Sequence, residues 1–243
     1  MAGTARYDGH ADWYDNWARS TGASFMAAAR DALMALAPAS PGRAVDVGCG
    51  TGLHVDVLQT RGYLVSGVDY SVDQLRVAVT RLPVARGDAR RLPFGLATVD
   101  LVVSMLTHTD IDEFDQLAAE AVRVLVPGGS LVYVGVHPCF VHPFAERRTE
   151  SVHLHPGYRT AGWREPTPFT GDAVRRRVGV HHLPLAELLN ALNDPRGRIE
   201  QVLEVDPASY PEVLAVRLRR QPPSDDALLL PRQPQQKSTP RPF

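Results

Sequence analysis

The residues best suited to chemistry in this sequence surround a glycine-rich stretch from Ala44 to Gly52, which reads A-V-D-V-G-C-G-T-G. It starts as the short apolar run of a buried parallel strand and ends in three alternating glycines before a helix-compatible segment, Leu53 to Gln59. Glycines in such a turn let the backbone approach a ligand closely, and the new helix offers unpaired N–H groups to it. The stretch therefore predicts a site for a nucleotide-like ligand.

An acidic residue distinguishes this turn from the dinucleotide fingerprint G-x-G-x-x-G, whose helix N-terminus faces a pyrophosphate. The pattern here is D-x-G-x-G-x-G, with Asp46 followed by Gly48, Gly50 and Gly52. A carboxylate is unfavourable beside a diphosphate but favourable beside an ammonium group. The turn resembles motif I of the class I S-adenosylmethionine-dependent methyltransferases.

The next two segments resemble later motifs of the same family, in the family's order. Leu64 to Asp69 is a second apolar strand that ends in a carboxylate, 17 residues beyond Gly52, where it can accept hydrogen bonds from ribose hydroxyls. Asp69-Tyr70-Ser71 thus resembles motif II. The segment 86–94 resembles the family's G-D-A-x-x-L-P-F pattern, which implies that Asp88 lies near the adenine amino group.

Two further segments complete the resemblance, which covers roughly residues 44 to 136. Residues 100–104, D-L-V-V-S, resemble the fourth strand, and 125–136 resemble the L-x-P-G-G turn and fifth strand. The family's cofactor is S-adenosyl-L-methionine, and another nucleotide-binding Rossmann domain is the alternative. The resemblance implies cofactor contacts from Tyr14, Asp46, Gly48, Cys49, Gly50, Gly52, Asp69, Tyr70, Ser71, Asp88, Ala89 and Ser104.

Alternating strands and helices predict an α/β fold with parallel strands and right-handed crossovers. Strands are expected at 44–48, 64–69, 84–87, 100–104, 130–136, 199–205 and 213–218, and helices at 24–36, 52–60, 71–80, 112–125 and 185–192. The short link between the last two strands favours an antiparallel hairpin. The resemblance agrees: it implies a Rossmann-like sheet of seven strands with the last strand antiparallel.

The predicted organisation is a single methyltransferase domain, 1–220, followed by a disordered tail, 221–243, rich in Pro, Gln and Ser. Residues 1–40 are expected to form lid helices over the cofactor, with Trp13 near the acceptor. An alternative is that Trp13 and Trp17, four residues apart, only staple this segment to the body.

Residues 137–182 form an insertion after the fifth strand, where an α/β sheet places its ligands, and we interpret it as an acceptor-binding cap. His137, Phe140 and Phe144 are its predicted acceptor contacts. The alternative is a packing loop that does not contact the acceptor.

Methyl transfer needs aligned reactants, a dry site and a place for a proton to go. His108 follows the fourth strand directly and is the first candidate base, with His137 the second. His108 could instead line the cofactor site or cap the helix expected near Asp112. Cys139 as a nucleophile and the histidines at 153, 155, 181 and 182 as metal ligands are weaker readings, so no metal is expected.

The composition describes an ordinary protein with a net charge of −1 and 44% hydrophobic residues, without the basic field of a nucleic-acid-binding protein. The absence of a long apolar run and the two separate cysteines predict a cytoplasmic protein without a membrane partner. Abundant Arg, Ala, Pro and Gly suggest a high-GC bacterial source. A homodimer is compatible with the sequence.

Three functions are compatible with these features. The first is methylation of a small-molecule acceptor at O, N or C in bacterial secondary metabolism. The second is a relative recruited to catalyse a cyclisation, because cofactor motifs indicate binding and not transfer. The third is a protein or RNA methyltransferase, which the modest charge disfavours.

Overall fold

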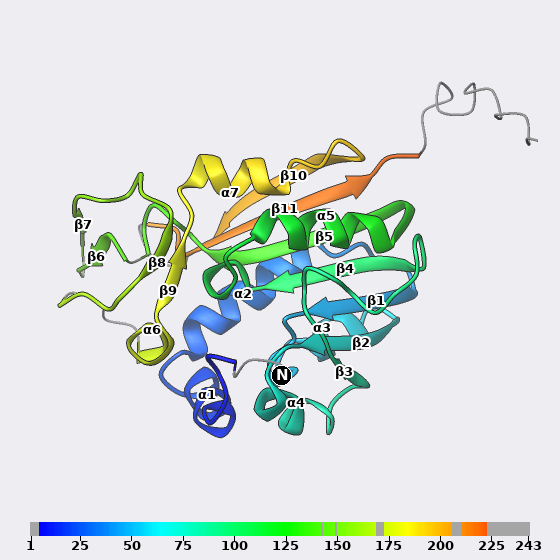
Figure 1. Ribbon diagram of the computed structural model, residues 1–243, viewed down its shortest axis with the longest axis horizontal. Helices are drawn as coiled ribbons and strands as arrows, with labels where there is room; N and C mark the ends of the chain where they lie inside the picture. The colour runs from blue at the N-terminus through cyan, green and yellow to red at the C-terminus, as the bar shows by residue number, and fades with distance from the viewer. Residues whose placement is uncertain (1–4, 142, 149, 169–172, 206–209, 223–243) are drawn as a thin grey trace, which may run out of the picture.

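The computed structural model describes residues 5–141, 143–148, 150–168, 173–205 and 210–222. Within these residues the main sheet has seven strands in the order β10-β11-β5-β4-β1-β2-β3 (Figure 1). β11 is antiparallel to both of its neighbours, whereas the remaining pairs are parallel. The predicted fold class is confirmed. The strands are β1 (Gly42–Val47), β2 (Tyr63–Asp69), β3 (Val84–Arg86), β4 (Val99–Met105), β5 (Leu125–Val136), β10 (Gly197–Val205) and β11 (Val213–Arg220).

Helices cover both faces of the sheet. One face packs against α2 (Ala23–Leu36), α3 (Val55–Gln59) and α4 (Val72–Ala78), and the other against α5 (Phe114–Val124) and α7 (Leu185–Leu192). Successive side chains of a strand point to opposite faces, so in β4 Leu101 and Val103 enter the first core and Val102 enters the second. Strands buried on both sides explain the continuous apolar runs in the sequence.

Two element boundaries differ most from the expectation, each for a local reason, and the others shift by at most two residues. The helix expected from residue 52 begins at Val55, because Gly52 has a φ of +76° and still belongs to the turn. The strand expected from residue 130 begins at Leu125, because Leu125 pairs with Val99 before the Pro-Gly-Gly irregularity.

The segment between β5 and α7 contains more regular structure than expected. It holds two small antiparallel pairs, β6 (Ala145–Arg147) with β7 (Val152–Leu154) and β8 (Gly162–Arg164) with β9 (Val180–His182), and the short α6 (Ala173–Val178). Residues 223–243 of the predicted tail lie outside the described residues. Among the helices that the structure describes, none combines the length and apolar character needed to cross a membrane.

The N-terminal segment precedes α1 (Ala11–Arg19), which packs beside α2 and α4. Trp13 and Trp17 are stacked with ring centroids 6.5 Å apart, and the Arg177 guanidinium lies 4.3 Å from the Trp13 ring centre. Trp13 therefore packs α1 against α6, which is compatible both with the predicted lid and with the alternative that this segment is only stapled to the body.

Candidate cofactor and acceptor site

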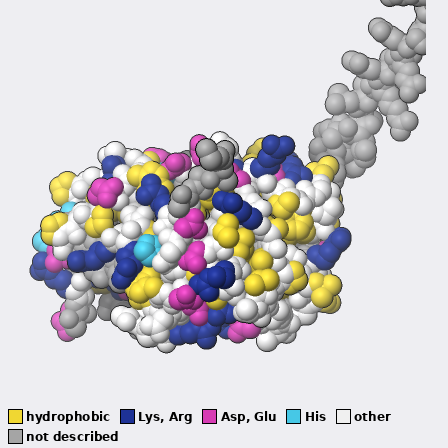
Figure 2. Space-filling model, turned by 60° about the horizontal axis from the view of Figure 1, so that its bottom comes forward, with side chains coloured by type: hydrophobic (Ala, Val, Ile, Leu, Met, Phe, Trp, Pro, Cys, Tyr) yellow, Lys and Arg dark blue, Asp and Glu magenta, His cyan; other side chains and the backbone are white. Residues whose placement is uncertain are grey.

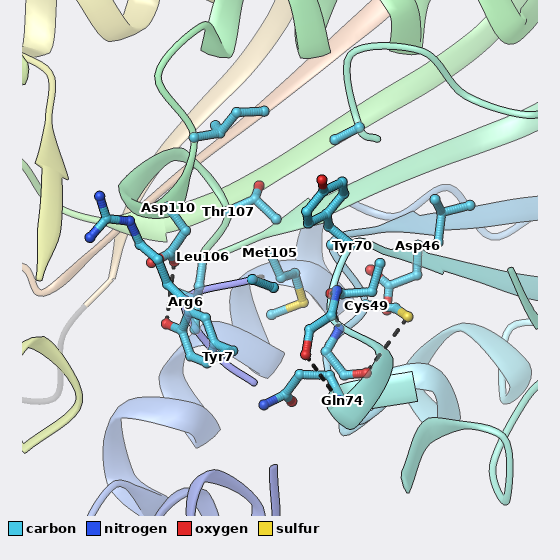
Figure 3. Close-up of a pocket in the computed structure, with 18 of the residues that line it drawn as sticks. Arg6, Tyr7, Asp46, Cys49, Tyr70, Gln74, Met105, Leu106, Thr107 and Asp110 are labelled. Carbon is cyan, nitrogen blue, oxygen red and sulfur yellow. Dashed lines mark hydrogen bonds between the residues drawn. The ribbon is translucent and has the colours of Figure 1, made fainter. Parts of the chain in front are cut away.

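A cavity of 370 Å³ lies where the carboxyl ends of β1, β2 and β4 meet (Figure 3). Parallel strands present these ends at one edge of the sheet, so motifs far apart in the sequence converge there. Its walls are the turn after β1, residues 69–71 after β2, residues 87–90 after β3, residues 105–107 after β4, and residues 5–7 ahead of α1.

Most of the predicted cofactor residues line this cavity. They are Tyr14, Asp46, Gly48, Cys49, Gly50, Asp69, Tyr70, Ser71, Asp88 and Ala89. Gly52 and Ser104 do not. A side chain at Gly52 would meet Leu82 on the far side of the turn, and the fully buried Ser104 hydroxyl bonds to Thr107.

The glycine turn is built to approach a ligand closely. Gly48 and Gly50 have φ values of +71° and +52°, which residues other than glycine rarely adopt. A Cβ at Gly48 would lie 2.0 Å from Cγ2 of Thr107, so the turn and the loop after β4 pack together only because this residue is glycine.

Backbone groups fix the carboxylate of Asp69 at the end of β2. Its Oδ2 accepts a hydrogen bond from the Gly50 N–H, and its Oδ1 accepts one from the Ser71 N–H, both at 2.8 Å. Burial raises the pKa of Asp69 although these N–H groups act in the opposite direction. The carboxylate is therefore oriented toward the cavity by two separate motifs.

Asp46 is a second buried carboxylate of the cavity. Its side chain is 2% exposed, and Oδ1 has no hydrogen-bond partner among the described residues. Burial, and next the negative charge of Asp69, raise its pKa to about 7. In the described structure neither Asp46 nor Asp69 forms an ion pair. A cationic ligand would therefore compensate the negative charge of both carboxylates.

These features suit S-adenosylmethionine, which carries an ammonium group, a sulfonium, a ribose and an adenine. The unpartnered Asp46 oxygen is suited to the cationic part, and Asp69 to the ribose hydroxyls. Asp88 and Ala89 form the wall that the resemblance assigns to adenine. Cys49 contributes only shape, because burial raises the pKa of its thiol far above the usual range.

The structure does not bring His108 to the cavity. His108 opens the 3₁₀ turn η1 (His108–Asp110), and its 2%-exposed side chain bonds through Nδ1 to the Tyr133 hydroxyl at 2.8 Å. Burial, with the nearby charge of Arg175, lowers its pKa to about 3. This placement does not suit the base that we expected, because the imidazole does not face the cavity and a pKa this low makes it a weak proton acceptor.

Asp110 faces the cavity in its place. With about three residues per 3₁₀ turn, residues two apart point in different directions, so the same turn buries His108 and presents Asp110. Asp110 Oδ1 accepts a hydrogen bond from Arg175 Nη1 at 2.9 Å, and Oδ2 accepts one from the Tyr7 hydroxyl at 3.3 Å. The buried Arg175 also donates from Nη2 to the Thr109 hydroxyl.

A second contact joins the same segments at the cavity. The Arg6 guanidinium lies 3.5 Å from the centre of the Trp163 ring, and Trp163 Nε1 donates a hydrogen bond to Asp112. The N-terminal segment, the loop after β4 and the insertion after β5 are thus held to one another around the cavity. Of the described residues in 137–182, Trp163 alone lines it.

The other predicted acceptor residues belong to the packing of the insertion. His137 is 1% exposed and bonds through Nε2 to Glu204 at 2.7 Å. Phe140 lies between His137 and Tyr210, and Phe144 packs edge-on against His182. None of the three lines the cavity, nor does Trp13. Their aromatic and histidine side chains were the right types, but they contact Glu204, Tyr210 and His182 instead of the cavity.

Cys139, the nucleophile alternative, lies outside the cavity. The Cys139 sulfur lies 3.4 Å from the Tyr158 hydroxyl, away from the cavity. In the described part of the chain no three His, Cys, Asp or Glu side chains are grouped to hold a metal ion.

Sequence reasoning missed several residues of the cavity wall: Arg6, Tyr7, Gln74, Met105, Leu106, Thr107, Asp110, Asp112 and Trp163. Asp110 belongs to the M-L-T-H-T-D segment, in which His108 was the predicted base, and Tyr7 belongs to the predicted lid. Leu106 has a φ of +61°, a strained conformation of the kind found at functional sites. No sequence signal distinguished Gln74.

Comparison with known proteins supports this description. Residues 45–133 match a family model described as a methyltransferase domain. An S-adenosylmethionine dependent methyltransferase from Mesorhizobium loti is 26% identical, with a TM-score of 0.67 over 78% of this chain and 96% of that one.

Two curated relatives match over shorter stretches. Malonyl-[acyl-carrier protein] O-methyltransferase 1 of Coxiella burnetii is 34% identical over 117 residues, 47% of this chain and 41% of the relative. Demethylmenaquinone methyltransferase of Thermobifida fusca is 33% identical over 137 residues, 53% of this chain and 58% of the relative. The chain thus spans about half the length of these relatives. The ordered motifs, the sheet and these similarities together support a class I methyltransferase, whose cofactor is S-adenosylmethionine.

Proposed function

We propose that this protein transfers the methyl group of S-adenosylmethionine to a small-molecule acceptor in bacterial secondary metabolism. The observation that carries the proposal is a pair of carboxylates in the cavity: Asp46, which is buried, and Asp69, which two backbone N–H groups orient. The loop after β4 and the insertion form a second wall of the same cavity. That second wall contains Leu106, Asp110 and Trp163. The cofactor, when bound, supplies a methyl group made electrophilic by the sulfonium.

The chain itself binds the two reactants, orients them and excludes water from the cavity. Asp46 and Asp69 hold the cofactor, and the contacts of Tyr7 with Asp110 and of Arg6 with Trp163 close the N-terminal segment over the cavity. Closure of this kind keeps water from competing with the acceptor.

The surface charge favours a small-molecule acceptor over nucleic acid. Figure 2 shows acidic and basic side chains mixed over the face it displays, without the continuous basic surface that nucleic acid requires. The names of the two curated relatives describe different acceptors, so O-, N- and C-methylation all remain within the proposal.

Asp110 is the proton acceptor in this proposal. For a hydroxyl acceptor, the O–H bond breaks as the O–CH₃ bond forms, whereas an ammonium acceptor loses its proton before the neutral amine attacks. In both cases the proton passes to the Asp110 carboxylate, the bond between the methyl group and sulfur breaks, and S-adenosylhomocysteine leaves. Burial raises the pKa of Asp110, while Arg175, Thr109 and Tyr7 act in the opposite direction. Asp69 and His181 are the other titratable groups close enough to interact with it.

The test is incubation of the purified protein with methyl-labelled S-adenosylmethionine and an extract of its source organism. We expect the label in a small-molecule fraction, with one S-adenosylhomocysteine formed per label transferred. Label in protein or RNA would assign a macromolecular acceptor. A changed extract component without S-adenosylhomocysteine would assign the recruited, cyclising function.

A further inference from the structure

Gln74 is a buried amide of the cofactor cavity that none of the motifs explains. It lies in the first turn of α4, and its backbone N–H donates a hydrogen bond to the side chain of Ser71, the N-cap. Its side chain lines the cavity and lies beside the glycine turn, since its Oε1 would be 3.5 Å from a Cβ placed on Gly50. Figure 3 shows it below Cys49.

The carboxamide of Gln74 has no partner in the described structure. The residue is 2% exposed, and neither Oε1 nor Nε2 forms a hydrogen bond with a described residue. A buried amide without partners destabilises the folded protein, and native proteins rarely retain one. An apolar side chain of the same shape would avoid that cost, so the amide is expected to have a partner that is not part of the chain.

The surroundings indicate the chemistry of that partner. Asp69, held by Gly50 and Ser71, offers only acceptors, so a ligand hydroxyl bonded to it has donated its hydrogen and still has a free oxygen. A carboxamide supplies the missing donor from Nε2 and a further acceptor from Oε1. Two neighbouring hydroxyls would be matched by Asp69 and Gln74 together, whereas a carboxylate alone would leave acceptor oxygens unmatched.

We propose that Gln74 is a second ribose-binding residue of this protein, whose carboxamide hydrogen-bonds the cofactor hydroxyls beside Asp69. The inference deepens the proposed function and rests on it, because it concerns the same cavity. It also explains why a polar side chain occupies a buried position on the cavity side of α4.

The experiment compares the wild-type protein with Gln74→Met, which keeps the length of the side chain and removes its hydrogen bonds. Gln116→Met is the matched control, since Gln116 is an exposed glutamine of α5 that does not line the cavity. Calorimetry measures the affinity for S-adenosylhomocysteine and for its 2′-deoxy and 3′-deoxy analogues. Thermal unfolding without ligand gives the unfolding midpoint and so measures the effect of the amide on the stability of the unliganded protein.

We expect Gln74→Met to weaken binding of S-adenosylhomocysteine about tenfold or more. For the analogue that lacks the hydroxyl contacted by Gln74, wild type and variant should bind with equal affinity. The unfolding midpoint of the unliganded variant should equal or exceed that of the wild type, because the variant buries no unpaired amide. Gln116→Met should leave every affinity unchanged.

Three results would overturn the inference while leaving the proposed function intact. They are unchanged affinity in Gln74→Met, an equal loss for all three ligands, and a lower unfolding midpoint that marks the amide as structural. If the wild-type protein bound none of the ligands, the proposed function would fail, and this inference with it.

Discussion

The Tyr133 hydroxyl lies 2.8 Å from Nδ1 of His108, within the core between β5 and α5. The His108 ring also packs edge-on against Phe114 and Tyr133, with centroid distances of 6.1 and 5.5 Å. The imidazole thus serves as a polar element of the core, and its low pKa follows from burial.

This placement predicts a specific pH dependence of stability. His108 has a pKa of about 3 in the folded state and about 6.5 when unfolded, so between these values only the unfolded state takes up the proton. The free energy of unfolding therefore falls as the pH drops below 6.5, by about 2 kcal/mol at pH 5 from this residue. His108→Gln should remove that part of the pH dependence while retaining methyl transfer within a few-fold.

Urea unfolding at pH 5 and pH 7.5 measures this effect. The control is His153→Gln, because His153 is an exposed histidine of β7, and its variant should keep the wild-type difference. A loss of transfer of a hundredfold or more in a folded His108→Gln protein would restore His108 as the base.

Asp46 predicts that cofactor affinity depends on pH. Without ligand its pKa is about 7, so below pH 7 a proton must leave before the carboxylate can pair with the ligand's ammonium group. Affinity for S-adenosylhomocysteine should fall about tenfold from pH 8 to pH 6. Asp46→Asn should bind more weakly at pH 8 and show little change with pH.

Calorimetry with 5′-methylthioadenosine, which lacks the ammonium group, provides the matched ligand control. Its affinity should change far less between the two pH values. Asp69, whose pKa burial also raises, titrates in the same cavity, and equal pH dependence for both ligands would assign the effect to Asp69.

Asp110→Asn tests the proposed proton acceptor. The amide keeps an oxygen for the hydrogen bond from Arg175 but cannot take the acceptor's proton. Label transfer from S-adenosylmethionine should fall by about 10²- to 10⁴-fold, with S-adenosylhomocysteine affinity almost unchanged. The acid limb of the wild-type rate profile should disappear with it.

Asp115→Asn, an exposed change on α5, is the control and should transfer label normally. Wild-type rates in Asp110→Asn would mean that the acceptor arrives without a proton to lose, as a neutral amine or a stabilised carbanion does.

Trp163 predicts where acceptor choice is determined. It is the described residue of the insertion that lines the cavity, whereas Phe140 packs between His137 and Tyr210. Trp163→Leu should change the acceptor KM or the range of labelled products, since aromatic walls supply much of the contact in such pockets. Phe140→Leu should leave both unchanged while lowering the unfolding midpoint.

Calorimetry with S-adenosylhomocysteine should give similar affinities in both variants. If Phe140→Leu altered acceptor selectivity and Trp163→Leu did not, the originally expected role of Phe140 would be supported.

The sequence by itself determined which residues form the cofactor side of the cavity. Strand, turn and motif follow one another within a few residues around Asp46 and Asp69, so their geometry is set locally by glycine φ values and by the strand ends. The alternation of strands and helices, together with the family resemblance, also led to the seven-strand sheet, because crossover handedness leaves few alternatives.

Only the tertiary structure decided which side chains form the proposed acceptor side of the cavity. Whether His108 or Asp110 faces the cavity depends on one 3₁₀ turn and on Arg175, 65 residues away in the chain from Asp110. His137 and Phe140 had suitable chemistry, but packing against Glu204 and Tyr210 on distant segments turned them inward. Side-chain direction at such positions depends on long-range packing, which residue type and spacing do not encode.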